Sequence, residues 1–156
     1  MARFPWSGRE ARAHAPQGAV AVIGLGRFGS ALALELAESG VEVLGIDSDD
    51  EIVQAHNGLL AQVVRADSTK EETLRQLAVH EFDSVVVAIG DDLQASILTC
   101  SVVRGFAHPE IWAKAISAQH GRILEQLGVD HIVYPEQEVG RRIAQIMRGA
   151  SADERR

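Results

Sequence analysis

The sequence has a single cysteine, Cys100, among its 156 residues. One cysteine excludes a disulfide within the chain and a metal site made of several cysteines of that chain, and it fits a reducing cytoplasm. No apolar run approaches the ~18–20 residues that a membrane-spanning helix needs. Residues 1–18 contain arginines but no continuous apolar stretch, so they lack the pattern of a secretory signal. We expect them to form a flexible N-terminal arm.

Positive charge is in short supply. Lysine and arginine together number 15 against 22 aspartates and glutamates, which gives a formal net charge of −7. Because proteins bind nucleic-acid backbones through lysine and arginine, we expect no nucleic-acid partner. The hydrophobic fraction of 46% and the charged fraction of 24% are ordinary for a soluble globular protein. The length suits one domain with its own core.

A catalytic constellation is also missing. The six histidines show no metal-ligand spacing, and most are expected at the surface. Ser30 has no histidine near it in sequence and no G-x-S-x-G around it, so helix packing explains it better than nucleophilic catalysis. The paired acids fall near predicted helix starts, where the helix dipole accounts for them. We therefore expect a protein that is not an enzyme.

Short β-rich apolar runs alternate with amphipathic runs along the rest of the chain. The predicted strands are Val20–Ile23, Glu42–Ile46, Ala61–Arg65, Ser84–Ala88, Ile111–Ala115 and Asp130–Val133. The predicted helices are Phe28–Ser39, Asp50–His56, Lys70–Val79, Leu93–Gly105, Ala118–Leu127 and Glu138–Arg148. This alternation predicts an α/β fold, a Rossmann-type doubly wound parallel sheet of about six strands with helices on both faces. Right-handed crossovers favour the strand order 3-2-1-4-5-6.

Three glycines follow the first predicted strand, in the pattern G-x-G-x-x-G with Arg27 and Phe28 between them. Gly24 would permit a tight turn, Gly26 would let a phosphate approach the backbone, and Gly29 would let the helix pack close to the strand. The unpaired amides at the helix start form an anion site. The alternative is a glycine-rich loop that binds nothing, but the second strand also fits the dinucleotide pattern.

That second strand ends in Asp47, close to the spacing of about 20 residues after the glycines at which a ribose-binding acid is expected. A carboxylate there accepts hydrogen bonds from ribose hydroxyls and repels a 2′-phosphate, so NADP is disfavoured. Asp47 is alternatively an N-cap of the next helix, although Ser48, Asp49 or Asp50 can take that role. We assign Ser48, which follows Asp47, to the same site.

Later strand ends should reach the same crevice. Asp67 and Ser68 follow the third strand and either contact adenine or, like Thr69, cap the next helix. Ile89 and Gly90 follow the fourth strand, where the cofactor would pass close to the backbone.

Charged residues also follow the fourth predicted strand and lie within the fifth. We expect Asp91 or Asp92 to cap the predicted helix Leu93–Gly105. Lys114, in the fifth strand, reaches a terminal phosphate or is a snorkelling side chain at the strand end.

Several segments together carry a family pattern: "VIGLGRFGSALALEL", "EVLGID", "VVVAIGDDLQASILT", "IWAKA" and "HIVYPEQEVGRRIAQ". They resemble the RCK domain, also called KTN, of bacterial potassium-uptake regulators, and most closely the Ktr type among the Ktr and Trk systems. The resemblance spans Val20 to Met147. It implies a nucleotide-binding domain over residues 19–149, with 150–156 as a polar tail or linker. Members of the family typically carry a second, smaller C-terminal ligand domain as well.

The resemblance implies a cytoplasmic regulatory subunit, peripheral at the inner face of the membrane, that gates a membrane potassium channel. Such subunits form homodimers that assemble into an octameric ring. The expected ligand is ATP or ADP, with NAD or NADH as the alternative and NADP disfavoured. An NAD-dependent oxidoreductase fragment and a redox-sensing transcriptional regulator are rival interpretations. They would need, respectively, a substrate domain and a basic helix-turn-helix.

The resemblance also implies residue roles. The three glycines match the phosphate turn and Asp47 the ribose acid, while Asp67 and Ile89 match the adenine pocket. Lys114 matches a phosphate-side lysine, and Glu136 a glutamate associated with a divalent cation or sodium. Arg27 matches an arginine that reaches the terminal phosphate, including that of a neighbouring subunit.

Two more of these assignments have structural alternatives, and an apolar stripe near the end of the chain also has two interpretations. Arg27 would otherwise be a surface residue, and Glu136 only an acid in a first helical turn. The apolar stripe Val139, Ile143, Ile146 and Met147 packs either on a partner subunit or in the core.

Overall fold

The computed structural model describes residues 18–154, so the predicted N-terminal arm lies outside the described residues except for Gly18. Six strands form one parallel sheet in the order β3-β2-β1-β4-β5-β6, which confirms the predicted topology. The strands are β1 (Val20–Ile23), β2 (Val43–Asp47), β3 (Gln62–Arg65), β4 (Ser84–Val87), β5 (Glu110–Lys114) and β6 (His131–Val133). The helices are α1 (Arg27–Glu38), α2 (Asp50–Ala55), α3 (Glu71–Gln76), α4 (Leu93–Arg104), α5 (Ala118–Gln126) and α6 (Pro135–Glu154), with a 3₁₀ turn η1 (Val79–Glu81).

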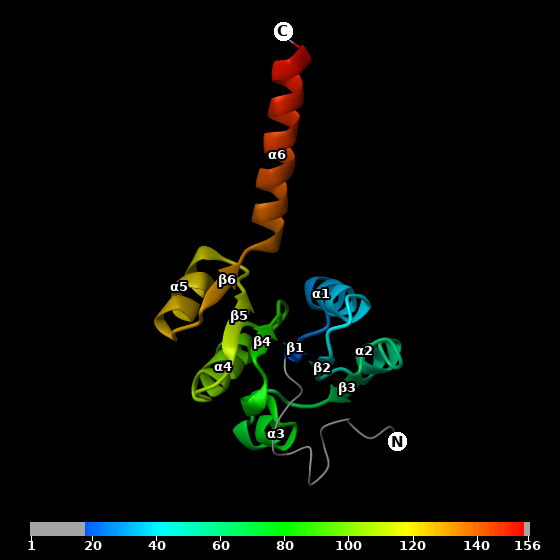
Figure 1. The fold of residues 1–156 in the computed structure, drawn as a ribbon. Coiled ribbons are helices and arrows are strands. Elements are labelled where there is room, and N and C mark those ends of the chain that lie inside the picture. The colour runs from blue at the N-terminus through cyan, green and yellow to red at the C-terminus, as the bar shows by residue number, and fades with distance from the viewer. Residues whose placement is uncertain (1–17, 155–156) are drawn as a thin grey trace.

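Helices cover both faces of the sheet (Figure 1). Successive residues of a strand point to opposite faces, and Val22 packs with α1 and α2 while Ile23 packs with α3, α4 and α5. β1 and β4 are therefore apolar at almost every position, as strands buried on both sides must be.

The third predicted helix is shorter in the structure. α3 is followed by Ala78 in the left-handed conformation (φ 60°) and then by η1. Val79 and Phe82 are both fully buried, and the turn at Ala78 lets the chain place both of them in the core before β4. The apolar pattern alone reads as one continuous helix, which is why the sequence prediction extends too far.

The register of the central strands determines where a ligand can enter. Ile23 pairs with Ile46 of β2 on one side and with Val87 of β4 on the other, so β1 and β4 end at the same level and β2 runs one residue further, to Asp47. The chain leaves β1 toward one face and β4 toward the other, and this divergence opens a crevice at the carboxyl edge of the sheet.

The last helix departs from the sequence prediction at both ends. It begins at Pro135, because proline is well tolerated at the first helical position. It continues to Glu154 through Gly149, so the predicted polar tail is helical over residues 150–154. A glycine inside a helix costs only about 1 kcal/mol relative to alanine, which the neighbouring residues overcome.

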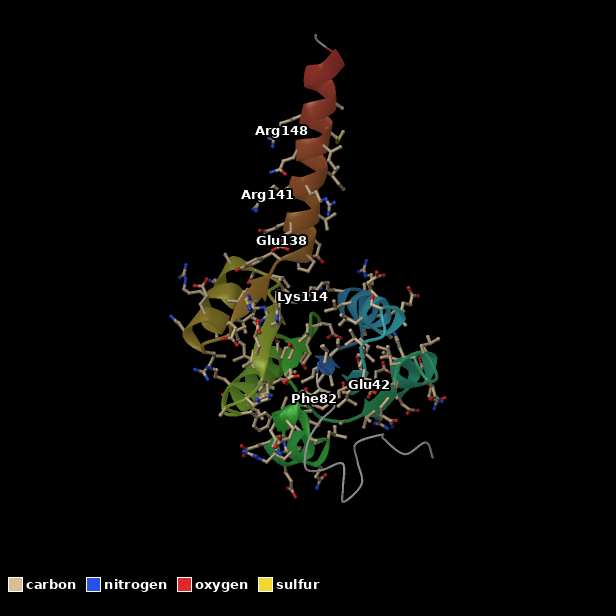
Figure 2. All side chains as sticks on the ribbon, viewed as in Figure 1. Glu42, Phe82, Lys114, Glu138, Arg141 and Arg148 are labelled. Carbon is tan, nitrogen blue, oxygen red and sulfur yellow. The ribbon has the colours of Figure 1, made fainter. Side chains whose placement is uncertain are left out.

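α6 stands away from the sheet, and its side chains extend into open space along most of its length (Figures 1 and 2). The predicted stripe is therefore exposed rather than part of the core: Val139, Ile143, Ile146 and Met147 are 51–64% accessible. Within residues 18–154, no helix has the length and apolar character needed to cross a membrane.

Among the histidines that the structure describes, His56 and His120 are buried and are exceptions to the expected surface placement. His120 is 1% exposed. Its Nδ1 accepts a hydrogen bond from the Ile116 amide at 3.0 Å, and its Nε2 lies 3.0 Å from Ser96 Oγ. Because Nδ1 accepts, it carries no proton, so Nε2–H donates to the serine. Burial lowers the pKa of His120 below its ordinary value.

We expect acidification to destabilise the fold through His120. The unfolded chain takes up a proton at about pH 6.5, whereas the folded chain resists protonation. The free energy of unfolding should thus fall as the pH drops below that value and be unaffected by this group above it. Urea unfolding at pH 7.5 and 5.5 measures the change.

The control is His120→Asn, whose side-chain oxygen can still accept from Ile116. This variant should be less stable at pH 7.5 but lose less stability on acidification. Equal losses in the two proteins would remove His120 as the cause.

Candidate functional site

A cleft of about 1070 Å³ occupies the carboxyl edge of the sheet, between the glycine turn, the ends of β2 to β5 and the first turn of α6. It brings together nearly all of the predicted site residues from six separate segments. The predicted residues that line it are Gly24, Gly26, Arg27, Phe28, Asp47, Ser48, Asp67, Ser68, Ile89, Gly90, Lys114 and Glu136. Gly29 does not line the cleft, because it is buried beneath the turn.

The glycine turn has the shape that the sequence predicts. Gly24 has φ 97°, and a Cβ there would come within 2.9 Å of the Ala88 carbonyl carbon. A Cβ on Gly29 would collide with the Gly24 carbonyl oxygen. Gly26 is different, since a Cβ there would meet nothing within 4 Å and would point into open space. The turn thus needs two of its glycines for packing and leaves the third facing the cleft.

α1 presents unpaired amides to this cleft. Its N-cap is Gly26, which offers no side-chain hydrogen bond, and its first turn carries no acidic residue. The first amides of a helix lack partners within the helix and carry a partial positive charge. Amides of this kind can bind an anion, and in particular a phosphate that approaches over a glycine.

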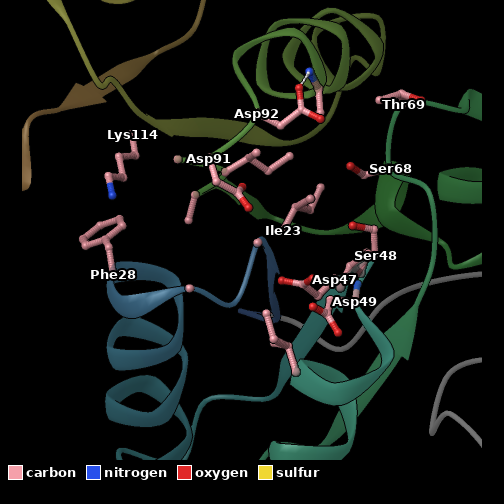
Figure 3. Close-up of a pocket in the computed structure, with 18 of the residues that line it drawn as sticks. Ile23, Phe28, Asp47, Ser48, Asp49, Ser68, Thr69, Asp91, Asp92 and Lys114 are labelled. Carbon is pink, nitrogen blue, oxygen red and sulfur yellow. Dashed lines mark hydrogen bonds between the residues drawn. The ribbon is translucent and has the colours of Figure 1, made fainter.

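Arg27 and Phe28 begin α1 and stand at the same end of the cleft. Arg27 is exposed and forms neither an ion pair nor a side-chain hydrogen bond with another described residue. Phe28 is half-buried against the core beneath α1. Figure 3 shows Phe28 and Lys114 at one end of the cleft and Asp47, Ser48 and Asp49 at the other.

Asp47 ends β2 and is fixed by two backbone amides. Its Oδ2 accepts from the Leu25 amide in the glycine turn at 2.8 Å, and its Oδ1 accepts from the Asp49 amide at 2.9 Å. The N-cap of α2 is Asp49, which accepts from the Glu51 amide at 2.9 Å, so the capping alternative for Asp47 is wrong. A carboxylate has about four acceptor sites, and two hydrogen bonds leave capacity for two hydroxyl donors.

The third strand end has its side chains engaged within the protein. Asp67 accepts from the amide and the hydroxyl of Thr69, at 3.0 and 2.6 Å. These hydrogen bonds lower the pKa of Asp67 and keep it charged. Ser68 is buried, and its hydroxyl lies 2.8 Å from Thr99 Oγ1. None of the three predicted candidates caps α3, whose N-cap is Lys70.

The fourth and fifth strand ends carry a cap and a cation. Asp92 caps α4 by accepting from the Ala95 amide at 3.0 Å, as predicted. The Lys114 side chain, 15% exposed, extends into the cleft over Gly90. Its Nζ lies 3.8 Å from Glu136 Oε1, so the two charged residues predicted at the phosphate end are paired.

Sequence reasoning missed a contact beneath the turn. His56 follows α2, yet its Nε2 lies 2.7 Å from Ser30 Oγ, and its Nδ1 lies 2.7 Å from the Ile52 carbonyl oxygen. Because a carbonyl only accepts, Nδ1 donates to it and Nε2 accepts from the serine hydroxyl. The pair fastens α2 to the first turn of α1, and Ser30 does not line the cleft.

Other lining residues also went unpredicted. Ile52, Gln94 and Leu98 come from α2 and α4, and no sequence motif marks them. Helix periodicity could identify the face that Gln94 and Leu98 share, but not that this face borders a cleft.

A metal site is not assembled within the described part of the chain. No group of three or more histidine, cysteine, aspartate or glutamate residues there is placed to hold an ion. Glu136 lies next to a lysine, and its role as a cation ligand stays a prediction.

Comparison with known proteins adds a family match. A family model described as TrkA-N domain matches residues 20–135. Ktr system potassium uptake protein C of Bacillus subtilis (strain 168) is 43% identical over 124 residues, which are 80% of this chain and 56% of that protein. Ktr system potassium uptake protein A of Vibrio alginolyticus is 40% identical over 127 residues, 81% of this chain and 58% of that protein. The chain therefore spans little more than half the length of these relatives.

Solved structures share the fold. The GsuK channel bound to NAD matches with a TM-score of 0.67 and 18% identity, over 77% of this chain and 22% of that one. GsuK bound to ADP matches with a TM-score of 0.66 and 20% identity, over 83% of this chain and 36% of that one.

Gly26 and Gly29, at the start of α1, should differ in their sensitivity to substitution. Gly29→Ala should lower the free energy of unfolding by about 1–3 kcal/mol or more, because its methyl group meets rigid backbone. Gly26→Ala should change it by less than about 1 kcal/mol, because φ there is −72° and space is open. Urea unfolding of both variants compares them directly, and similar losses would contradict the geometry described for the turn.

Proposed function

Because the chain belongs to the TrkA-N domain family, we propose that it binds an adenine nucleotide in the cleft and acts as a regulatory domain of a potassium transport system. The observation that carries this proposal is the joint presence of free helix amides behind Gly26 and of Asp47 at the adjacent strand end. Such a site accepts a diphosphate joined to a ribose. ATP or ADP is the leading ligand, with NAD or NADH as the alternative.

The charges of the cleft support one orientation of the ligand. The diphosphate lies on the amides of α1, and the ribose hydroxyls donate to Asp47. Adenine lies toward Asp67 and Ile89, and the outer phosphate faces Arg27. A guanidinium offers several donors to phosphate oxygens, so Arg27 would distinguish ATP from ADP. A 2′-phosphate would meet the carboxylate of Asp47, which disfavours NADP.

The role is regulatory rather than catalytic. The relatives are named for potassium uptake, and the described residues at the cleft include no histidine or cysteine. A ligand changes a conformational equilibrium only if it binds two states with different affinity, and a contact that depends on phosphate number provides that difference. An NAD-dependent oxidoreductase is the competing function, and consumption of NADH with any acceptor would favour it.

The partner we propose is a membrane potassium channel subunit, contacted at its cytoplasmic side. The relatives' names support potassium transport, and GsuK is itself a channel. We further propose that two chains form a homodimer and that dimers assemble into an octameric ring. The exposed stripe on α6 supports the dimer, because exposed apolar residues along one helix face typically pack on a partner.

Titration calorimetry with ATP, ADP, NAD and NADP tests the ligand assignment. ATP and ADP should bind, and NADP should bind most weakly. Arg27→Ala should weaken ATP binding by about 10- to 100-fold and ADP binding by less, in line with the loss of a charged hydrogen bond of about 1.5–3 kcal/mol. Asp47→Asn should weaken every ribose-containing ligand. If the wild type binds ATP and ADP with different affinities and Arg27→Ala binds them equally, the role of Arg27 is supported. If the ratio of the two affinities is the same in both proteins, that role is refuted.

Sedimentation or light scattering tests the dimer. Ile143→Glu should shift the protein toward monomer, because a buried unpaired charge at an interface is costly. Leu59→Glu is the matched control, since Leu59 is exposed to a similar extent, 55% against 51%, but lies between α2 and β3. A strictly monomeric wild type, or equal effects of the two substitutions, would argue against assembly through α6.

A further inference from the structure

Tyr134 is the single residue that joins the sheet to α6. It follows Val133, the last residue of the edge strand β6, and precedes Pro135, the first residue of the helix. Its carbonyl oxygen accepts a hydrogen bond from the Glu138 amide at 2.9 Å, so the helix begins immediately after it. A proline disfavours helical conformations at the residue before it, which restricts the backbone of Tyr134. The junction is therefore short and stiff, with no loop between strand and helix.

The Tyr134 side chain sits in a notch on α5. The notch is made by Gly121, a buried residue where a Cβ would overlap the Tyr134 hydroxyl oxygen and lie 2.8 Å from Cζ of the ring. The backbone does not require glycine at this position, because Gly121 lies inside a regular helix and its φ is not positive. Glycine weakens a helix interior relative to alanine. The absence of a side chain at Gly121 is therefore explained by the tyrosine that occupies its space.

The rest of α6 is held much less firmly. Residues 136–150 are all exposed, and the helix leaves the domain beside α5 and β6 (Figure 1). The ion pair of Glu136 with Lys114 joins an 80% exposed side chain across 3.8 Å, and such a pair contributes little. Tyr134, by contrast, packs against the larger hydrophobic core. Pivoting of the helix about its base is thus limited chiefly by the contact of Tyr134 with α5.

We propose that Tyr134 and Gly121 form an anchor that sets the direction of α6, and that this direction determines whether two copies of the chain can pair. The proposal rests on the dimer put forward in the proposed function, and deepens it by naming positioning residues for that assembly. In a symmetric dimer the same surface of both chains must meet. The exposed stripe runs along α6, so a helix that points elsewhere does not bring its stripe to the partner.

An anchored helix pairs more tightly than one that pivots. A pivoting helix loses freedom of movement when it pairs, and its apparent affinity is reduced by the fraction of time that it spends in the paired direction. If that fraction fell to about a tenth, the dissociation constant of the dimer would rise about 10-fold for each chain. Because Tyr134 limits pivoting before the partner arrives, the stripe is already oriented for pairing.

A distance measurement within one chain tests the anchor. Spin labels on Gln126→Cys and Arg148→Cys, two exposed positions, report the distance between α5 and α6, and dilution with unlabelled protein excludes distances between chains. Cys100 should stay unlabelled, because it is fully buried and burial raises the pKa of its thiol to about 12. Filling the notch with Gly121→Ala, or removing the ring with Tyr134→Ala, should broaden a distance distribution that is otherwise narrow.

Sedimentation of the unlabelled variants tests the consequence for assembly, and circular dichroism checks that each variant folds. Both single variants should weaken the dimer by about 10-fold or more. The double variant Gly121→Ala/Tyr134→Phe should restore the narrow distribution and most of the dimer affinity, because removing the hydroxyl oxygen frees space for the methyl group. Gly149→Ala is the control, since it adds the same methyl group to α6 where nothing lies within 4 Å, and it should change neither measurement.

The outcomes separate the anchor from the proposed function. An unchanged distance distribution in both folded single variants would overturn the anchor. A broadened distribution with unchanged dimer affinity would overturn its role in assembly. A wild type that stays monomeric would overturn the proposed dimer, and the role of the anchor in pairing with it.

Discussion

The close approach of Gly29 to the carbonyl of Gly24 is the constraint on which the rest of the site depends. No side chain fits between them, so the start of α1 lies directly against the end of β1. This contact aims the free amides of the helix at the crevice where the chain leaves β1 and β4 toward opposite faces. Asp47 reinforces the arrangement from the neighbouring strand, because it accepts the Leu25 amide within the turn.

The cleft separates charges along its length. Carboxylates lie where β2 and β3 end, and cationic groups lie at the start of α1 and at the end of β5, although Asp91 and Asp92 follow β4 and Glu136 is paired with Lys114. Each carboxylate oxygen of Asp47 accepts a hydrogen bond from one backbone amide. Asp47 thus has a structural role in addition to being a candidate acceptor for ligand hydroxyls. A ligand with hydroxyls at one end and phosphates at the other matches this distribution, and a ligand with the opposite arrangement would not.

The topology and most of the cleft could be predicted from the sequence because they depend on local signals. Apolar runs identify buried strands, and the glycine spacing identifies the turn, so Gly24, Gly26 and Asp47 lie where the pattern predicts. Contacts between distant segments were not predictable in the same way. His56 meets Ser30 only because α2 folds back onto α1, and Lys114 meets Glu136 only because β6 directs the chain across the end of β5. The predicted last helix was too short because proline and glycine usually mark the ends of helices. In the structure, Pro135 begins α6 and Gly149 lies inside it.

The length of α6 has a mechanical consequence. Its 20 residues make a rod of about 30 Å that is attached to the domain at one end only. A tilt of roughly 10° at the base would move the far end by about 5 Å, for a rise of 1.5 Å per residue. A small change of angle at its base is therefore magnified into a larger displacement at its far end.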